Sequence, residues 1–298
     1  MIEVRGLVKS FGETKALDGA DMNVRNSSVY GLVGPNGCGK TTMIKHLLGV
    51  LRQDAGTVSY DGSDIWENAS IKQQIASIPD NWFFFHSATV SDMKKYYQGF
   101  YGNFSEERFK KLSALFDINP SRRISSLSKG MKKQVAFWIT LSTMPGYLIL
   151  DEPVDGLDPV MRRQIWRLLM DDVYQRGTTV LVSSHNLREL EDVCDFVGIM
   201  NNGKIEIERS LTKLQENMVK IQIVFPEEVK ELPQGIPALH SSRMGRVYTL
   251  IMKMNEQEAK DALSQYEPLM FEALPLTLEE IFIYEMGGKD HDIKDAVL

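Results

Sequence analysis

The chain has 298 residues, of which 43% are hydrophobic and 25% charged, a balance that fits one large globular domain with an appendage, or two domains. The formal net charge of −6 argues against nonspecific nucleic-acid binding as the main task, because such binding requires a basic surface. Its two cysteines form neither a metal-ligand set nor a disulfide framework, and no apolar run approaches the roughly 20 residues that span a bilayer.

The N-terminal part of the chain predicts short strands, then a glycine-rich loop and a helix. Strands are expected at 1–11, 15–25, 28–37 and 53–62, with the helix at 41–51. Helical patterning then dominates about 83–142. Strands and helices alternate again after this segment: apolar runs at 147–153 and 178–185, typical of strands buried in a parallel sheet, flank a helix at 160–177, and an Asn-Gly turn predicts a hairpin at 195–210.

The pattern changes near residue 217. Strands are expected at 219–225 and 245–254 and helices at 256–266 and 277–286, with proline-bearing loops between. We therefore expect a doubly wound α/β domain over 1–215, with a helical subdomain at about 83–142, and an α+β accessory domain over 216–298.

The glycine-rich loop matches G-x-x-x-x-G-K-[ST] residue for residue, between a strand and a helix. Its glycines let backbone N–H groups turn toward a phosphate, and the following helix adds its N-terminal dipole. Lys40 would contact the β- and γ-phosphates, and Thr41 can ligate Mg²⁺. A chance glycine-rich turn is the alternative, which the flanking strand and helix disfavour. The expected nucleotide-binding residues are Gly34, Pro35, Asn36, Gly37, Cys38, Gly39, Lys40, Thr41 and Thr42.

Three further polar residues follow buried strands. Asp151 ends one strand, where an open α/β sheet places its ligands, and can hold Mg²⁺. Glu152 beside it could polarise an attacking water, although adjacent acids often only begin a loop. His185 ends the next strand and can point at the same crevice, although a lone histidine is more often structural.

The stretch "SSLSKGMKKQ" adds a second anion-binding helix N-terminus, opened by Ser128 and Gly130. One phosphate loop already serves one triphosphate, so this second helix end is surplus within a monomer. A second copy of the protein would use it.

Over roughly Met1 to Arg209, the ordered set of phosphate loop, "LSKGM", "LILDEP", "GLD" and "SSH" resembles the nucleotide-binding subunits of ATP-binding cassette (ABC) transporters. The resemblance implies a RecA-like P-loop NTPase core with an antiparallel β subdomain, a helical insertion and here a small C-terminal α+β appendage. It also implies two such subunits closing head to tail around two ATP molecules with Mg²⁺. By that likeness Phe11 stacks on adenine, Glu152 is the general base, and His185 contacts the γ-phosphate. Asp158 couples the two sites across the interface.

Two positions depart from the family pattern. Lys129 stands where the family's signature usually has glycine, and Asp80 stands where a glutamine commonly touches Mg²⁺. We still include Asp80 among the metal-site residues, through a bridging water. The aromatic residues that follow, 82–85, have two interpretations: core packing, or a groove for a helix of a membrane subunit.

The function most favoured is therefore an ATPase subunit that drives a separate integral membrane permease from the cytoplasmic face of the membrane, for export. The tail beyond about residue 217 looks like the extension of export-type (ABC-2-like) cassettes. A soluble ABC-type ATPase and a nucleotide-gated regulatory protein remain the alternatives. No nucleic-acid partner is expected, and the cargo is left open.

Overall fold

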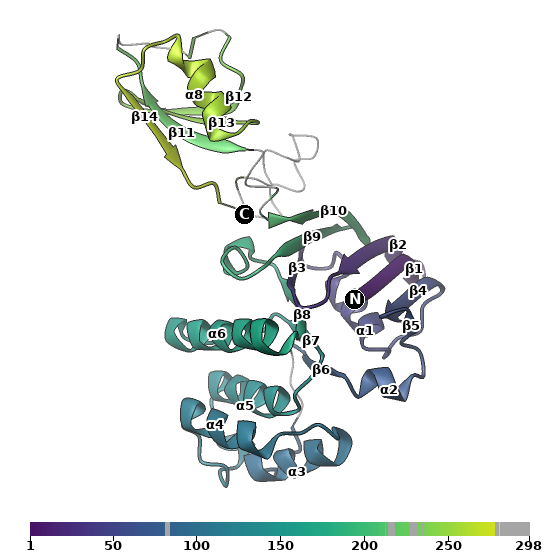
Figure 1. Ribbon diagram of the computed structural model, residues 1–298. Coiled ribbons are helices and arrows are strands. Elements are labelled where there is room, and N and C mark those ends of the chain that lie inside the picture. The colour runs from purple at the N-terminus through teal and green to yellow at the C-terminus, as the bar shows by residue number, and fades with distance from the viewer. Residues whose placement is uncertain are drawn as a thin grey trace. The chain divides into compact units, whose positions relative to one another are not determined.

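The computed structural model describes residues 1–80, 84–211, 213, 218–226, 232–233, 235–277 and 280. The chain divides into two compact units (Figure 1): Met1–His185 with Val193–Glu208, and Asn186–Asp192 with Arg209–Leu298. The predicted domain boundary between residues 215 and 216 and most of the predicted helix at 277–286 lie outside the described residues.

The core of the first unit is a six-stranded sheet in the order β10-β9-β3-β8-β7-β6. Strand β3 pairs in parallel with both β8 and β9, and β7 pairs in parallel with both β6 and β8. Its strands, in chain order, are Val29–Val33 (β3), Ile75–Ile78 (β6), Tyr147–Asp151 (β7), Thr179–Ser184 (β8), Phe196–Asn201 (β9) and Lys204–Ser210 (β10). Every residue of β3, β7 and β8 is buried, as their unbroken apolar runs predict.

Helices connect the strands of this sheet as the predicted α/β alternation requires. Helix α1 (Lys40–Leu47) follows β3, and α6 (Pro159–Arg176) joins β7 to β8. The two strands β9 and β10 meet at the predicted turn, where Asn202 and Gly203 have φ values of 45° and 77°, both in the left-handed region that this turn demands. The expectation of a doubly wound P-loop core is thus confirmed.

A second sheet of the same unit has the order β2-β1-β4-β5 and is antiparallel. Its strands are Ile2–Phe11 (β1), Thr14–Val24 (β2), Ala55–Tyr60 (β4) and Ser63–Asp64 (β5), and the short helix Ala69–Lys72 (α2) follows. Side chains of both sheets and of α1 form one hydrophobic cluster, in which Tyr60 and Tyr147 meet edge to face at 4.8 Å.

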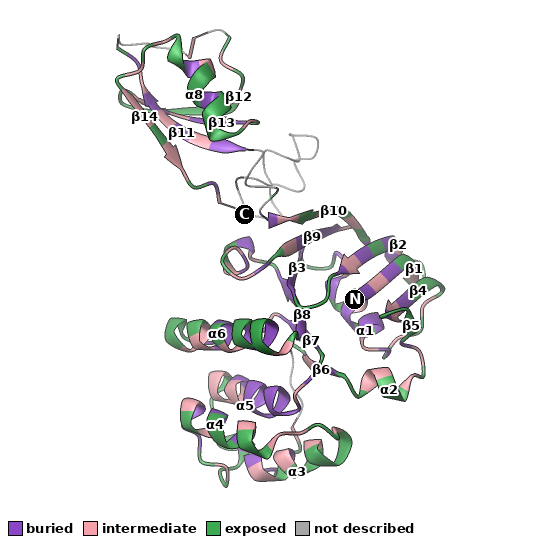
Figure 2. Cartoon of the chain, viewed as in Figure 1, coloured by how far each residue is buried: buried purple, intermediate pink, exposed green. Residues whose placement is uncertain are grey.

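The predicted helical subdomain contains α3 (Val90–Phe100), α4 (Glu106–Phe116) and α5 (Lys129–Ser142), with a 3-10 turn at Ile124–Ser126. Side chains cap all three helices: Thr89, Ser105 and Ser128 each accept a bond from a backbone N–H of the first turn. Helix α5 is buried along its C-terminal half (Figure 2). There Trp138 stacks on Phe109 at 4.5 Å and donates its indole N–H to the Phe109 carbonyl.

The second unit has its own core. Its antiparallel sheet has the order β12-β13-β11-β14, and the strands are Val219–Val224 (β11), Ala238–Met244 (β12), Val247–Met252 (β13) and Met270–Leu274 (β14), with helix α8 at Glu256–Ser264. Alternate residues of β11 are buried with Leu250 and Leu263. Strands β11 and β13 and helix α8 were expected, whereas the sequence did not predict β12 and β14. The unit also includes a 3-10 turn at Leu187–Glu189.

Among the described residues, no helix has both the length and the apolar character that crossing a membrane requires.

Candidate active site

The glycine-rich loop runs from the end of β3 to the start of α1, and its glycines are needed for different reasons. A Cβ at Gly34 would lie 2.2 Å from the Met200 carbonyl oxygen, so no side chain fits there. Gly37 and Gly39 have φ values of 83° and 114°, in the region that favours glycine. Gly39 is the N-cap of α1, and no described side chain caps it. The first N–H groups of α1 are thereby available to an anion.

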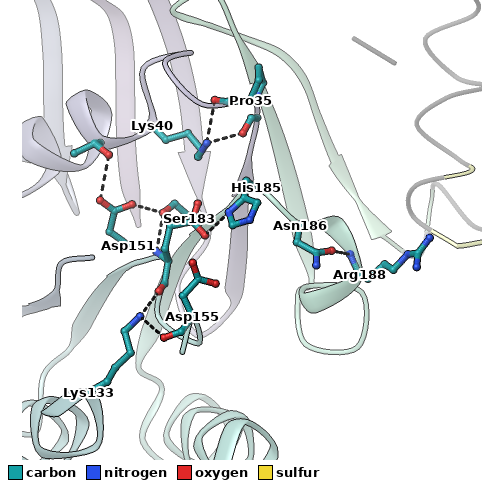
Figure 3. A network of polar contacts seen from close by, with 12 residues as sticks. Pro35, Lys40, Lys133, Asp151, Asp155, Ser183, His185, Asn186 and Arg188 are labelled. Carbon is teal, nitrogen blue, oxygen red and sulfur yellow. Dashed lines mark hydrogen bonds and ion pairs between the residues drawn. The ribbon is translucent and has the colours of Figure 1, made fainter. Parts of the chain in front are cut away.

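Lys40, the first residue of α1, is only 7% exposed. Its Nζ donates to the carbonyl oxygens of Gly34 at 2.5 Å and Pro35 at 3.1 Å (Figure 3). The loop therefore curls around the amine and holds this positive charge beside its own N–H groups, which is the arrangement a phosphate requires.

Asp151 lies at the carboxyl end of β7 and is 5% exposed. Its two carboxylate oxygens accept from hydroxyls of two different elements: Thr41 at 3.2 Å and Ser183, on β8, at 2.5 Å. Oxygen atoms are the ligands that Mg²⁺ prefers, and Asp80 lines the same pocket as Thr41 and Asp151. This donor set fits a magnesium ion.

Glu152 has a backbone φ of 48°, in the left-handed region that a non-glycine residue seldom adopts. Its N–H lies 3.2 Å from the Ser183 carbonyl oxygen, and its Oε2 lies 2.9 Å from Nδ1 of His185. The His185 side chain is 49% exposed and that of Glu152 15%. Burial raises the pKa of Glu152, and the neighbouring His185 opposes this in part. A carboxyl with a raised pKa is a better proton acceptor, as a general base should be.

These groups surround one pocket of about 260 Å³. The predicted residues that line it are Asn36, Gly37, Gly39, Lys40, Thr41, Thr42, Asp80, Asp151 and Glu152, and Ala16 of β2 joins them. Gly34 and Pro35 contribute through their bonds to Lys40, and His185 through Glu152. Cys38 is 5% exposed and packs in the hydrophobic cluster instead.

The remaining predicted residues do not line this pocket. Ser128 caps α5 by accepting from Met131 N at 3.2 Å, and Asp158 caps α6. A Cβ at Gly130 would lie 3.0 Å from the Gly156 carbonyl oxygen, so "LSKGM" and "GLD" contact each other within one chain. Phe11 is 49% exposed at the end of β1.

Sequence reasoning missed two polar residues of this region. Ser183 bonds to Asp151, and the signal was available, since "SSH" ends a buried strand as "LDEP" does. Lys133 is 4% exposed on α5, and its Nζ donates to the carbonyl oxygens of Glu152 and Asp155. Its helical spacing from the buried Phe137 was the available signal.

A protein-family model described as "ABC transporter" matches residues 17–155. The ABC transporter ATP-binding protein YtrB of Bacillus subtilis (strain 168) is 31% identical over 97% of this chain and 99% of its own length. The Nod factor export ATP-binding protein I of Paraburkholderia xenovorans (strain LB400) is 27% identical over 98% of this chain and 98% of its own length. A solved structure of the ATP-binding subunit of an ABC transporter superimposes with a TM-score of 0.67 at 26% identity, covering 72% of this chain and 92% of that one.

Proposed function

The chain belongs to the ATP-binding proteins of ABC transporters and is an ATPase, and from this premise we propose that it closes with a second cassette around two Mg-ATP and drives a separate membrane permease in export. The observation that supports the proposal most is the single pocket where Lys40, Thr41, Asp151 and Glu152 meet, with His185 bonded to Glu152. Such a set can hold a triphosphate and activate a water beside it.

The residues divide the work of hydrolysis among them. The loop N–H groups and Lys40 bind the β- and γ-phosphates, while Glu152 accepts a proton from the water that attacks the γ-phosphorus. His185, 2.9 Å from Glu152 Oε2, orients that carboxylate, and in this scheme it would also contact the γ-phosphate. Thr41, Asp151 and Asp80 would hold Mg²⁺, which when bound offsets the negative charge of the phosphates. The products are ADP and phosphate.

Closure with a second cassette is supported by two predicted nucleotide-binding residues that do not line the pocket of their own chain. Ser128 and Gly130, at the anion-binding N-terminus of α5, are absent from the residues that line the pocket of their own chain. In the closed pair, Ser128 and Gly130 would contact the ATP bound to the partner cassette. Asp158 would lie at the same interface, and Phe11 would stack on the adenine of the ATP bound to its own chain. The partner is a second copy or a similar cassette.

A groove of about 450 Å³ between α2 and α3 supports docking to a permease. Its lining residues are Ala69, Lys72, Gln73, Tyr96, Tyr97, Phe100 and Tyr101. Phe100 is 62% exposed, and Phe85, 47% exposed, meets Tyr96 edge to face at 5.1 Å. Of the aromatic residues suspected from the sequence, Phe85 thus lies beside this groove, while Trp82 and Phe83 lie outside the described residues. An exposed aromatic groove suits an apolar helix. We place the chain at the cytoplasmic face of the membrane, held by this contact.

Phe100→Glu tests this docking. Tagged protein carrying the change should recover a multi-span membrane protein from solubilised membranes of its own host about tenfold less than the wild-type chain, because a charge would be buried in the groove. Quantitative mass spectrometry gives the yield. The matched control is Tyr174→Glu, at an 86% exposed aromatic position on α6. Recovery of ribosomes or DNA by the wild-type chain, in place of a membrane protein, would favour the soluble alternative.

The raised pKa of Glu152 predicts a pH profile. Glu152 must be ionised to accept a proton, and burial raises its pKa above the ordinary 4.5. The turnover number should therefore fall as the pH drops, with a midpoint above the ordinary glutamate value. Phosphate release at saturating Mg-ATP between about pH 5 and pH 8 measures it. The residual rate of Glu152→Gln should not show this fall at low pH. If both proteins show the same fall, the titrating group is not Glu152.

A further inference from the structure

Lys133, on α5, is a buried lysine to which the scheme above gives no role. It is 4% exposed, and its Nζ donates to the Glu152 carbonyl oxygen at 2.6 Å and to the Asp155 carbonyl oxygen at 3.1 Å (Figure 3). The carboxylates of Asp80, Glu152 and Asp155 and the ammonium of Lys129 are the charges that act on it. A buried ammonium is costly unless its donors are satisfied, so these two bonds fix where the amine lies.

The first of these bonds acts on the residue proposed as the base. Glu152 adopts a left-handed φ of 48°, a strained conformation that persists only where the surroundings enforce it. Its N–H bonds to the Ser183 carbonyl oxygen on β8, and its own carbonyl accepts from Lys133. The two sides of the residue are thus held by different elements, and its side chain is left to reach His185.

Lys133 also connects Glu152 to the start of helix α5. This helix begins at Lys129 with Ser128 as its cap, and Lys133 lies one turn further along the same helix. A displacement of the helix N-terminus would therefore move the Lys133 backbone relative to the Glu152 and Asp155 carbonyls, and the two bonds of its ammonium would transmit that displacement to them.

We propose that Lys133 is a positioning residue for Glu152, which couples the N-terminus of α5 to the placement of the base. The inference rests on the proposed role of Glu152 in hydrolysis. Lys133 touches neither nucleotide nor water in this scheme. It acts through the main chain of Glu152, so it should affect the chemical step and leave nucleotide affinity unchanged.

The test is steady-state hydrolysis by Lys133→Met, which keeps the length of the side chain and removes its donors. We expect the turnover number to fall about 10- to 100-fold, because a small displacement of a catalytic group costs this much, while KM for ATP changes less than about twofold. Lys133→Arg retains donors and should recover part of the loss. Lys110→Met, at an exposed lysine of α4, is the control and should hydrolyse at the wild-type rate.

A double-mutant cycle separates positioning from general weakening of the fold. If Lys133 acts through Glu152, then adding Lys133→Met to Glu152→Gln should lower the residual rate less than about twofold further. Equal losses in both backgrounds, or a wild-type turnover number in Lys133→Met, would overturn the inference. Should Lys133→Met fail to fold, Lys133→Gln replaces it, because its amide is uncharged and one bond shorter than the lysine side chain, so the two carbonyls lose their shared donor and the turnover number should fall as well. A wild-type chain without ATPase activity would instead refute the proposed function.

Discussion

Glu152→Gln should hydrolyse ATP at least about 100-fold more slowly than the wild-type chain and still bind it. The amide matches the carboxylate in shape but does not accept the proton of the attacking water. The bonds of the Glu152 main chain to Ser183 and Lys133 do not depend on the side chain, so the substituted residue should stay in place. Phosphate release at saturating Mg-ATP gives the rate, and a fluorescent nucleotide gives the affinity.

The same variant tests closure. Because ATP is bound and not consumed, the two-cassette complex should accumulate, and light scattering after size exclusion in Mg-ATP should report twice the monomer mass. Glu107→Gln, at a 78% exposed position on α4, is the control and should hydrolyse normally. A wild-type rate in Glu152→Gln would remove Glu152 from the role of base. A monomer at saturating Mg-ATP would contradict the proposed closure with a second copy.

Lys40→Met should lose nucleotide binding, with the ATP affinity falling about 100-fold, which corresponds to about 2.7 kcal/mol. The Lys40 ammonium lies inside the loop, 2.5 Å from the Gly34 carbonyl oxygen, so its charge acts at short range on phosphates held there. Methionine keeps the aliphatic volume of this buried side chain and removes the charged amine together with its two hydrogen bonds. Isothermal titration with Mg-ATP measures the effect.

Lys45→Met is the matched control, since Lys45 is an exposed lysine of the same helix. It should bind ATP as the wild-type chain does. Circular dichroism should show that both variants are folded, because the Lys40 amine also holds two loop carbonyls together. An unchanged affinity in folded Lys40→Met would refute the assigned phosphate contact.

The parts of the fold that the sequence predicted are those with a strong local signal. Strands β3, β7 and β8 each contain consecutive apolar residues because both faces of these strands are buried. The sequence did not predict strand β12, because its residues are nearly all exposed and show no alternation of apolar and polar side chains. It did not predict β6 either, because a strand of four residues is too short to give a clear pattern. Such strands are specified by their neighbours in the sheet more than by their own side chains.

In the candidate site, too, the residues with a strong local signal were predicted and those placed by tertiary packing were not. The loop motif predicted Lys40 and Thr41 because its spacing is tied to one local conformation. The bond from Ser183 to Asp151 joins two strands that a helix separates in sequence, so local pattern does not specify it. Lys133 lies among other lysines in the sequence, and although its spacing from Phe137 places it on the same helix face, the packing of α5 is what shows that it is buried.

The close contact at Gly34 also bears on how this sequence can change over time. A side chain there would collide with the Met200 carbonyl at the end of β9, whatever the pocket contains. Selection for a stable fold would therefore keep this glycine even in a duplicate of the gene that had lost its enzymatic role. Gly37 has open space around it and is restricted only by its backbone angle, which asparagine or aspartate tolerates better than other residues. In a duplicate that has lost its enzymatic role, we expect substitutions at Gly37 to appear before substitutions at Gly34.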